Sequence, residues 1–145
     1  MAEEEPKYVA MVCTADTFRP CGTSQVRWLD CDDDFELARE LWTMHGIDLS
    51  KEEWLSFRDH GYTYCAVVLD GRIVSRSAVF TRTETEWETA AVWTSEAHRG
   101  RGYGKSVVSF VTQSILDSGH LATCHTRADN AAMIAAAKSV GFVLR

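Results

Sequence analysis

Two strand-like runs joined by Asp70-Gly71 constrain the fold of this chain more than any other feature. Residues 62–69 and 72–81 are rich in β-branched and aromatic residues, which favour strands. An Asp-Gly pair between two such runs predicts a two-residue hairpin whose turn needs positive φ angles. A further strand-like run covers residues 85–94. We therefore expect a three-stranded antiparallel meander.

The meander lies in the middle of a longer series of expected elements. Hydrophobic spacing and end signals predict three further strands and four helices. In chain order these are a strand at 7–13, a strand at 25–31, a helix ending at Met44, a helix from Ser50 to about Gly61, the meander, a helix at 105–118, a strand leading to Asn130 and a helix ending at Gly141.

Two of the helix starts carry recognisable capping residues. Asp32-Asp33-Asp34 places carboxylates at the N-terminus of the first helix, where the helix dipole favours negative charge. Ser50, followed three residues later by Glu53, matches the capping box. Both patterns predict where a helix begins.

The composition is typical of one ordered globular domain, because 46% of the 145 residues are hydrophobic and 25% are charged. No repeat or linker is visible, so we expect one domain over residues 1–145, with residues 1–7 as a flexible tail. The longest apolar stretch, Ala131–Ala137, is far shorter than the ~20 residues that cross a bilayer. The acidic N-terminus lacks the features of a signal peptide. We expect a cytoplasmic protein with no membrane partner.

Cysteine content and net charge exclude further classes. The five cysteines are odd in number and include no C-x-x-C pair, which favours reduced thiols and predicts no metal site. A net charge of -6 opposes nucleic-acid binding, which relies on basic surfaces. Residues 1–60 carry 14 acids and 6 bases, whereas residues 61–145 carry 7 and 9. This split fits a solvated acidic surface, or an anionic cofactor in the second half and a cationic acceptor near the first.

The segment His98–Ser106 is a glycine-rich turn between an expected strand and an expected helix. Glycines let the backbone approach an anion closely, and the N–H groups at a helix start point at it. Arg99, Arg101 and Lys105 add positive charge. The segment therefore predicts a phosphate-binding loop.

The spacing of the glycines separates the known phosphate-binding patterns. A Walker A loop needs a glycine where this chain has Arg99, and the dinucleotide pattern G-x-G-x-x-G does not fit Gly100, Gly102 and Gly104. The arrangement Arg99-x-x-Gly102-x-Gly104 instead resembles the acyl-CoA-binding motif of the GNAT superfamily of N-acetyltransferases. The order of elements over residues 25–142 is similar to that family as well.

The resemblance implies an α/β (α+β) fold in which helices flank a mixed central sheet and the C-terminal strand hairpin is shortened. It also implies acetyl-CoA as cosubstrate. Together with Thr94, Asp129-Asn130 and Gly141-Phe142, the Arg99 motif is also similar to the glycine N-acyltransferase-like branch, whose members acylate small amines or amino acids. By resemblance, the cofactor-binding residues are Val92, Trp93, Thr94, Arg99, Gly100, Arg101, Gly102, Tyr103, Gly104, Lys105 and Asn130.

The resemblance implies Glu88 as the general base, acting through water. Glu84 and Glu86 lie at two-residue spacing from Glu88, so we expect them on the same strand face, where repulsion raises the pKa of one carboxyl. The family's usual proton donor is a tyrosine at the position of Ala137. The candidates that replace it are Cys124, His125, Tyr103 and water.

These residues predict transfer of an acetyl group from acetyl-CoA to an amine, by direct attack in a ternary complex. The acceptor is a small molecule or a peptide. The alternative is a non-catalytic acyl-CoA-binding or regulatory domain, favoured by Ala137 and the short C-terminus. In the family a terminal strand hairpin walls the acceptor site, so here we expect the sheet edge to be covered by residues 8–12 or by a second subunit in a homodimer.

Overall fold

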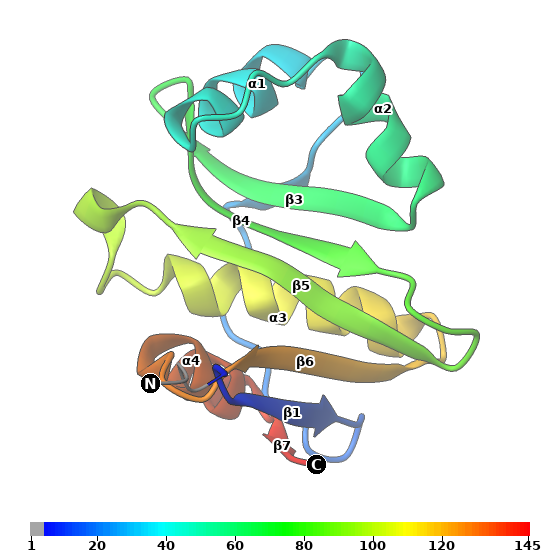
Figure 1. Cartoon of the computed structure of the whole chain (residues 1–145). Coiled ribbons are helices and arrows are strands. Elements are labelled where there is room, and N and C mark those ends of the chain that lie inside the picture. The colour runs from blue at the N-terminus through cyan, green and yellow to red at the C-terminus, as the bar shows by residue number, and fades with distance from the viewer. Residues whose placement is uncertain (1–4) are drawn as a thin grey trace.

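The strands of the chain form one mixed sheet in the computed structural model, which describes residues 5–145. Within those residues the strand order is β2-β3-β4-β5-β6-β1-β7 (Figure 1). The strands are β1 (Tyr8–Cys13), β2 (Val26–Trp28), β3 (Tyr62–Leu69), β4 (Arg72–Phe80), β5 (Glu86–Thr94), β6 (Leu121–Arg127) and β7 (Val143–Leu144). The helices are α1 (Phe35–Met44), α2 (Lys51–Asp59), a short η1 (Glu96–His98), α3 (Tyr103–Asp117) and α4 (Ala131–Val140).

The predicted meander is confirmed. β3 pairs antiparallel with β4, and β4 pairs antiparallel with β5. The hairpin turn has φ angles of +51° at Asp70 and +75° at Gly71, as a two-residue Asp-Gly turn requires. The strand expected at 25–31 is shorter than predicted, since only Val26–Trp28 pairs with β3.

β5 and β6 run parallel and stay together only briefly. Their pairing covers Glu86–Glu88 against Leu121–Thr123, after which the two strands part. Ala91, three residues further along β5, has φ +55°, a left-handed conformation that an L-residue rarely adopts. The register of the β4 and β5 pair also shifts between Arg76 and Ala78. The parallel strands therefore open a gap in the sheet beside an irregular stretch of β5.

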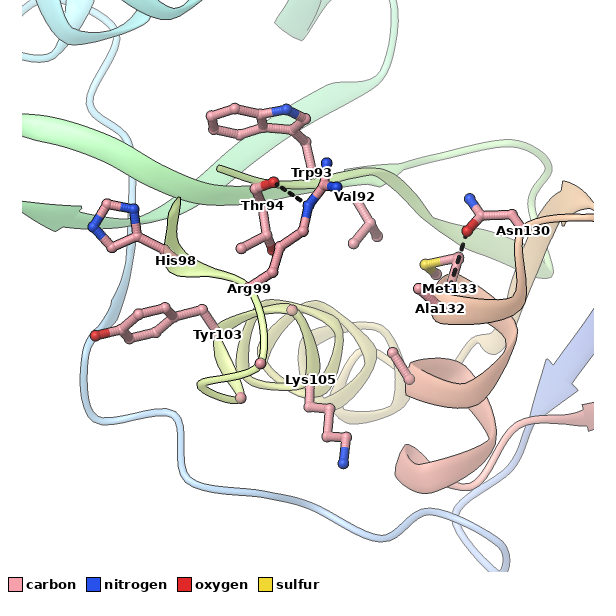
Figure 2. A pocket seen from close by; sticks show the side chains of 14 residues that line it. Val92, Trp93, Thr94, His98, Arg99, Tyr103, Lys105, Asn130, Ala132 and Met133 are labelled. Carbon is pink, nitrogen blue, oxygen red and sulfur yellow. Dashed lines mark hydrogen bonds between the residues drawn. The ribbon is translucent and has the colours of Figure 1, made fainter. Parts of the chain in front are cut away.

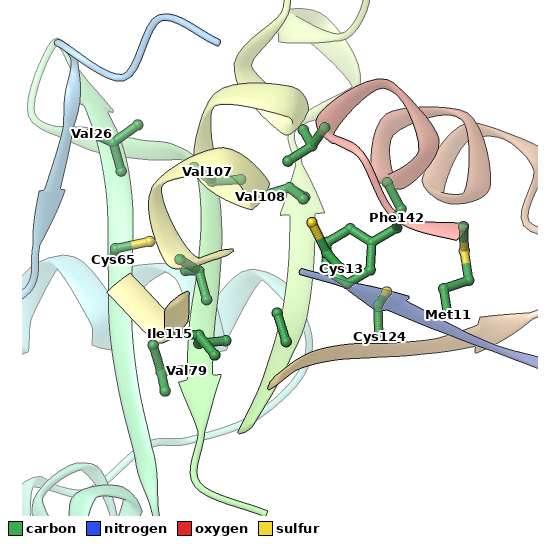
Figure 3. Packing of buried hydrophobic residues seen from close by; sticks show 14 of the residues in the cluster. Met11, Cys13, Val26, Cys65, Val79, Val107, Val108, Ile115, Cys124 and Phe142 are labelled. Carbon is green, nitrogen blue, oxygen red and sulfur yellow. The ribbon is translucent and has the colours of Figure 1, made fainter. Parts of the chain in front are cut away.

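The N-terminal strand β1 lies between β6 and β7 in the sheet. β1 pairs antiparallel with β6 along its whole length, and β7 pairs with the other edge of β1. Met11, Cys124 and Phe142 come from these segments and lie together in one buried cluster (Figure 3). Of the two arrangements expected for this edge, the structure confirms the one that uses residues 8–12.

The helices cover both faces of the sheet. α1 and α2 contact β4 and β3, while α3 contacts β4 and β5 and packs against α4 (Figure 1). Trp42 and Trp54 belong to the core cluster beneath α1 and α2, whereas Val107 and Val111 of α3 belong to the other cluster. No helix within residues 5–145 is both long and apolar enough to cross a bilayer.

The two predicted helix starts have different outcomes. The capping box of Ser50 and Glu53 is confirmed, with both reciprocal hydrogen bonds present. Asp34 occupies the N-cap position of α1 but makes no side-chain capping bond. Its carboxylate accepts hydrogen bonds from Arg27 at 2.8 and 3.0 Å and from the Asp30 N–H at 2.6 Å. The carboxylate thus ties β2 to α1 instead of capping the helix.

Candidate functional site

A pocket of about 590 Å³ opens between the C-terminal half of β5 and the starts of α3 and α4 (Figure 2). It lies where β5 has parted from β6. Ten of the eleven predicted cofactor-binding residues line it, namely Val92, Trp93, Thr94, Arg99, Gly100, Gly102, Tyr103, Gly104, Lys105 and Asn130. The eleventh, Arg101, is exposed in the same loop and does not line the pocket.

The loop into α3 presents backbone donors that have no partner. Gly100 and Gly102 adopt φ angles of +78° and +86°, and Gly102 is the N-cap of α3 without a side-chain capping bond. Ser106 donates the first helical bond, to the Gly102 carbonyl at 3.0 Å. Within residues 5–145 no backbone acceptor bonds the N–H groups of residues 100–105. Free donors at the positive end of a 15-residue helix bind an anion.

The space around the loop fits a bulky anion such as a pyrophosphate. A Cβ added to Gly100 or Gly102 would meet no atom of the described chain within 4 Å. Arg99 donates from Nε to the Thr94 carbonyl at 3.3 Å, which fixes the loop to the end of β5. Lys105 extends from the first turn of α3 (Figure 2), so its ammonium adds positive charge at the mouth of the pocket.

Two buried hydroxyls hold the irregular part of β5 in place. Ser75 donates to the Trp93 carbonyl at 3.1 Å and lies 2.9 Å from the Thr94 hydroxyl. Ser77 donates to the Ala90 carbonyl at 2.8 Å. Both serines are fully buried, so they satisfy carbonyls on either side of the distortion at Ala91. The wall of the pocket therefore has a fixed backbone shape.

Asn130 lies across the pocket from the glycine loop (Figure 2). Its Oδ1 accepts a hydrogen bond from the Met133 N–H at 3.1 Å and caps α4. The side-chain amide nitrogen stays available to a ligand. Sequence reasoning missed four other lining residues: His98, Ala132, Met133 and Ala136. Ala136 lies four residues after Ala132 and three after Met133, so these three share one helical face. That spacing, read onward from Asn130, is the sequence signal that could have found them.

The predicted base, Glu88, belongs to a compact polar cluster on the opposite side of β5 from α3. The Glu88 carboxylate lies 2.5 Å from Nδ1 of His125 on β6 and 3.6 Å from Nη1 of Arg82. Arg82 Nη1 also lies 3.0 Å from Nδ1 and 2.9 Å from Nε2 of His125. Since an ionised carboxylate can only accept, the 2.5 Å contact with Glu88 assigns a ring proton to Nδ1. The structure thus brings two candidate catalytic residues, Glu88 and His125, into contact.

Of the three glutamates expected to repel one another, Glu86 has a cationic partner. Glu86 forms an ion pair with Arg145, and the hydrogen bond from Arg145 lowers the pKa of the Glu86 carboxyl. Glu84 is exposed in the turn before β5. For Glu86 the pKa shift is therefore opposite to the one predicted from like charge, because the Arg145 cation pairs with its carboxylate.

Cys124 does not fit the role of proton donor. Its side chain is 1% exposed in the same core cluster as Met11 and Phe142 (Figure 3). Burial raises the pKa of the Cys124 thiol to about 12, and the nearby Glu88 charge adds to the effect. Tyr103 opens α3 and lines the pocket. His125 and Tyr103 stay as protein candidates for the donor.

Across residues 5–145 no group of three or more His, Cys, Asp and Glu side chains is placed to hold a metal ion. The five cysteines are all free thiols. The polar chemistry of the pocket is therefore that of backbone donors, basic side chains and the amide of Asn130.

Solved structures similar to this chain carry the same fold. An acetyltransferase of the GNAT family from Colwellia psychrerythraea has 13% identity and a TM-score of 0.70, over 97% of this chain and 53% of that one. A GCN5-related N-acetyltransferase from Sphaerobacter thermophilus has 15% identity and a TM-score of 0.69, over 97% of this chain and 50% of that one. A GCN5-related N-acetyltransferase from Kribbella flavida has 16% identity and a TM-score of 0.65, over 96% of this chain and 54% of that one. The chain spans about half the length of these proteins.

Comparison of the sequence with curated proteins gave no significant match, but comparison with protein families did. Residues 23–142 match the family described as acetyltransferase (GNAT) family, a range that includes the glycine loop, β5, β6 and α4. The sheet with its parted parallel strands, the free amides at the start of α3 and this match agree. The chain belongs to the GNAT family of acetyltransferases.

Proposed function

We propose that this protein transfers an acetyl group from acetyl-CoA to a primary amine by direct attack within a ternary complex. The observation that supports this most is the row of unpartnered N–H groups at residues 100–105, at a pocket that opens where β5 and β6 part. That combination provides an anion site and an extended channel in one place.

Each part of the pocket suits one part of acetyl-CoA. The amides of residues 100–105 bind the pyrophosphate, with Arg99 and Lys105 supplying charge. The free edge of β5 at Val92–Thr94 binds the amide groups of the pantetheine arm. When bound, acetyl-CoA supplies a thioester carbonyl that a neutral amine can attack and a thiolate that can leave.

The protein's own groups then position the acceptor and move its proton. Glu88 takes a proton from the acceptor's ammonium group, directly or through water, because only the neutral amine has the lone pair that attacks. His125 donates from Nδ1 to Glu88 and keeps the carboxylate oriented. Glu88 and Val92 are four residues apart on β5, so the base and the channel are carried by one strand. Holding amine and thioester together supplies much of the acceleration.

A second candidate function is binding of acyl-CoA without catalysis. Ala137, at the position of the family's usual tyrosine, is fully buried and offers no proton to a thiolate. The two functions differ in one measurement, because only the enzyme releases free thiol from acetyl-CoA when amines are added.

The glycine loop offers a well-matched test. Gly102 and Gly119 have φ angles of +86° and +82°, and a Cβ at either would meet nothing within 4 Å. Gly102→Asp places a carboxylate against the pyrophosphate, whereas Gly119→Asp puts the same strain and charge at the far end of α3. We expect calorimetry to show that the dissociation constant for acetyl-CoA is at least 100-fold larger in G102D and unchanged in G119D. Equal affinities in the two variants would refute the cofactor site.

A further inference from the structure

Arg76 lies at the centre of the sheet, on the face that α1 and α2 cover. It pairs with Ala66 of β3 on one side and with Trp93 of β5 on the other. Its guanidinium carbon lies 4.5 Å from the ring centroid of Trp42 and 5.8 Å from that of Tyr64. The aromatic rings stabilise the cation from one side, and they also remove much of its hydration.

The guanidinium of Arg76 has no anionic partner in the described part of the chain. No carboxylate of residues 5–145 lies within ion-pair distance of it, and its Nε is buried without a hydrogen bond. Burial lowers the pKa of Arg76, yet a guanidinium stays charged in proteins. A desolvated charge with unused donors is unfavourable unless an anion compensates it.

The cross-strand register puts Arg76 and Glu88 on the same face of the sheet. Opposite pairs along β4 and β5 are Arg76 with Trp93, Ala78 with Ala90, and Phe80 with Glu88. Directly opposite residues project to the same side. Two alanines therefore separate the cation from the carboxylate, and four residues of strand span about 13 Å. The Arg76 and Glu88 side chains therefore share one face of the sheet, with methyl groups and no bulky side chain of β4 or β5 between them.

We propose that Arg76 binds an oxyanion group of the acceptor, a carboxylate or a phosphate, while the acceptor's amine faces Glu88. This inference rests on the proposed acetyl transfer and adds the class of acceptor: an amine that carries an oxyanion, held by the two-pronged donor geometry of a guanidinium. The sequence suggested a cationic acceptor from the acidic N-terminal half. The half-buried cation of Arg76, on the same sheet face as Glu88, argues for an acceptor with both charges.

Two matched pairs of amines test the inference. L-phenylalanine and L-phenylalaninol differ by a carboxylate, and O-phosphoethanolamine and ethanolamine differ by a phosphate. Binding of each is measured by NMR titration of the arginine Nε–H resonances, with and without saturating CoA. Wild-type protein is compared with three variants. Arg76→Met removes the charge, and Arg76→Lys keeps the charge but loses the two-pronged donor geometry of the guanidinium. Arg72→Met is the control, because it removes an exposed arginine from the same strand.

We expect at least one oxyanion amine to bind 10-fold or more tightly than its partner and to shift the Arg76 Nε–H resonance. Arg76→Met should abolish that preference, Arg76→Lys should reduce it, and Arg72→Met should retain it. CoA affinity should be the same in all four proteins, which also shows that they are folded. If Arg76→Met does not fold, Arg76→Lys decides the question.

Three results would overturn the inference. The first is that the wild type binds neither oxyanion amine more tightly than its matched partner. The second is that the tighter binding survives in the Arg76 variants. The third is that the oxyanion amine binds more tightly but shifts only the Nε–H resonances of other arginines. Failure of the proposed acetyl transfer is detected separately, as absence of acetyl-CoA binding or of thiol release, because the amine titration without CoA requires neither acetyl-CoA nor turnover.

Discussion

Nδ1 of His125 donates a hydrogen bond to the Glu88 carboxylate at 2.5 Å, joining β5 to β6 directly after their backbone pairing ends. Glu88 is the last residue of β5 paired with β6, opposite Thr123, and His125 lies two residues beyond. A side-chain bond thus continues the link between strands that are about to part. The same contact sets the position of the carboxylate that we assign as the base.

Replacing Glu88 with glutamine should remove the base while keeping its shape. We expect kcat for thiol release to fall by about 100-fold or more, within the usual range for loss of a general base, with an unchanged dissociation constant for acetyl-CoA. Glu84→Gln, in the exposed turn before β5, is the matched control and should retain full activity. A full rate in E88Q would assign the base elsewhere.

His125 should affect the rate only through Glu88. His125→Ala is expected to lower kcat about 10-fold, and His125→Asn, whose amide can still donate to the carboxylate, should recover part of the loss. In an E88Q background His125→Ala should have little further effect, because residues that act through one another are not additive. Additive losses in the double mutant would show that His125 acts independently.

The Arg27 and Asp34 pair should make stability depend on pH. The hydrogen bond from Arg27 lowers the pKa of Asp34 below its ordinary value of 3.8. The resulting stabilisation is present above that value and is lost as the pH falls through the lower folded pKa. Asp34→Asn should lower the free energy of unfolding by about 1–3 kcal/mol at pH 7. The difference in this free energy between the variant and the wild type should shrink below pH 4.

Urea unfolding at a series of pH values measures this dependence. Asp33→Asn is the control, because Asp33 is the exposed neighbour of Asp34 and should leave the curve of stability against pH nearly unchanged. If the loss of unfolding free energy in D34N stayed constant down to pH 2, the ionised carboxylate would not be its cause.

Gly141 should tolerate no side chain. It ends α4 with φ +109°, and an added Cβ would lie 2.1 Å from the backbone oxygen of Thr17. Gly141→Ala should therefore destabilise the protein by about 3 kcal/mol or more, from a left-handed conformation plus overpacking against backbone. Gly119→Ala shares the positive φ without the contact and should cost about 1 kcal/mol. Equal melting temperatures for the two variants would disprove the clash.

The features that could be predicted from the sequence are those set by residues close together in the chain. The Asp70-Gly71 turn, the Ser50 capping box and the glycine loop each depend on a few neighbouring residues, so their local chemistry determines the outcome. The structure places the parting of the parallel strands after Glu88.

The features that could not be predicted depend on register between distant segments. Arg82 and His125 are 43 residues apart, and nothing local indicates that they meet at Glu88. Arg145 likewise pairs with Glu86 only because β7 joins the sheet through β1. The left-handed Ala91 carries no sequence signal, since alanine is the usual choice for helices and not for positive φ.

The position of β1 inside the sheet has a consequence for synthesis. Tyr8 pairs with Arg127, so β1 leaves the ribosome more than a hundred residues before its partner. At 5–20 residues per second, that delay is about 6–24 seconds. During it the apolar face of Met11 and Cys13 has neither β6 nor Phe142 against it. Closing so long a loop is slow, so this apolar stretch is without its native cover until the end of the chain has been made.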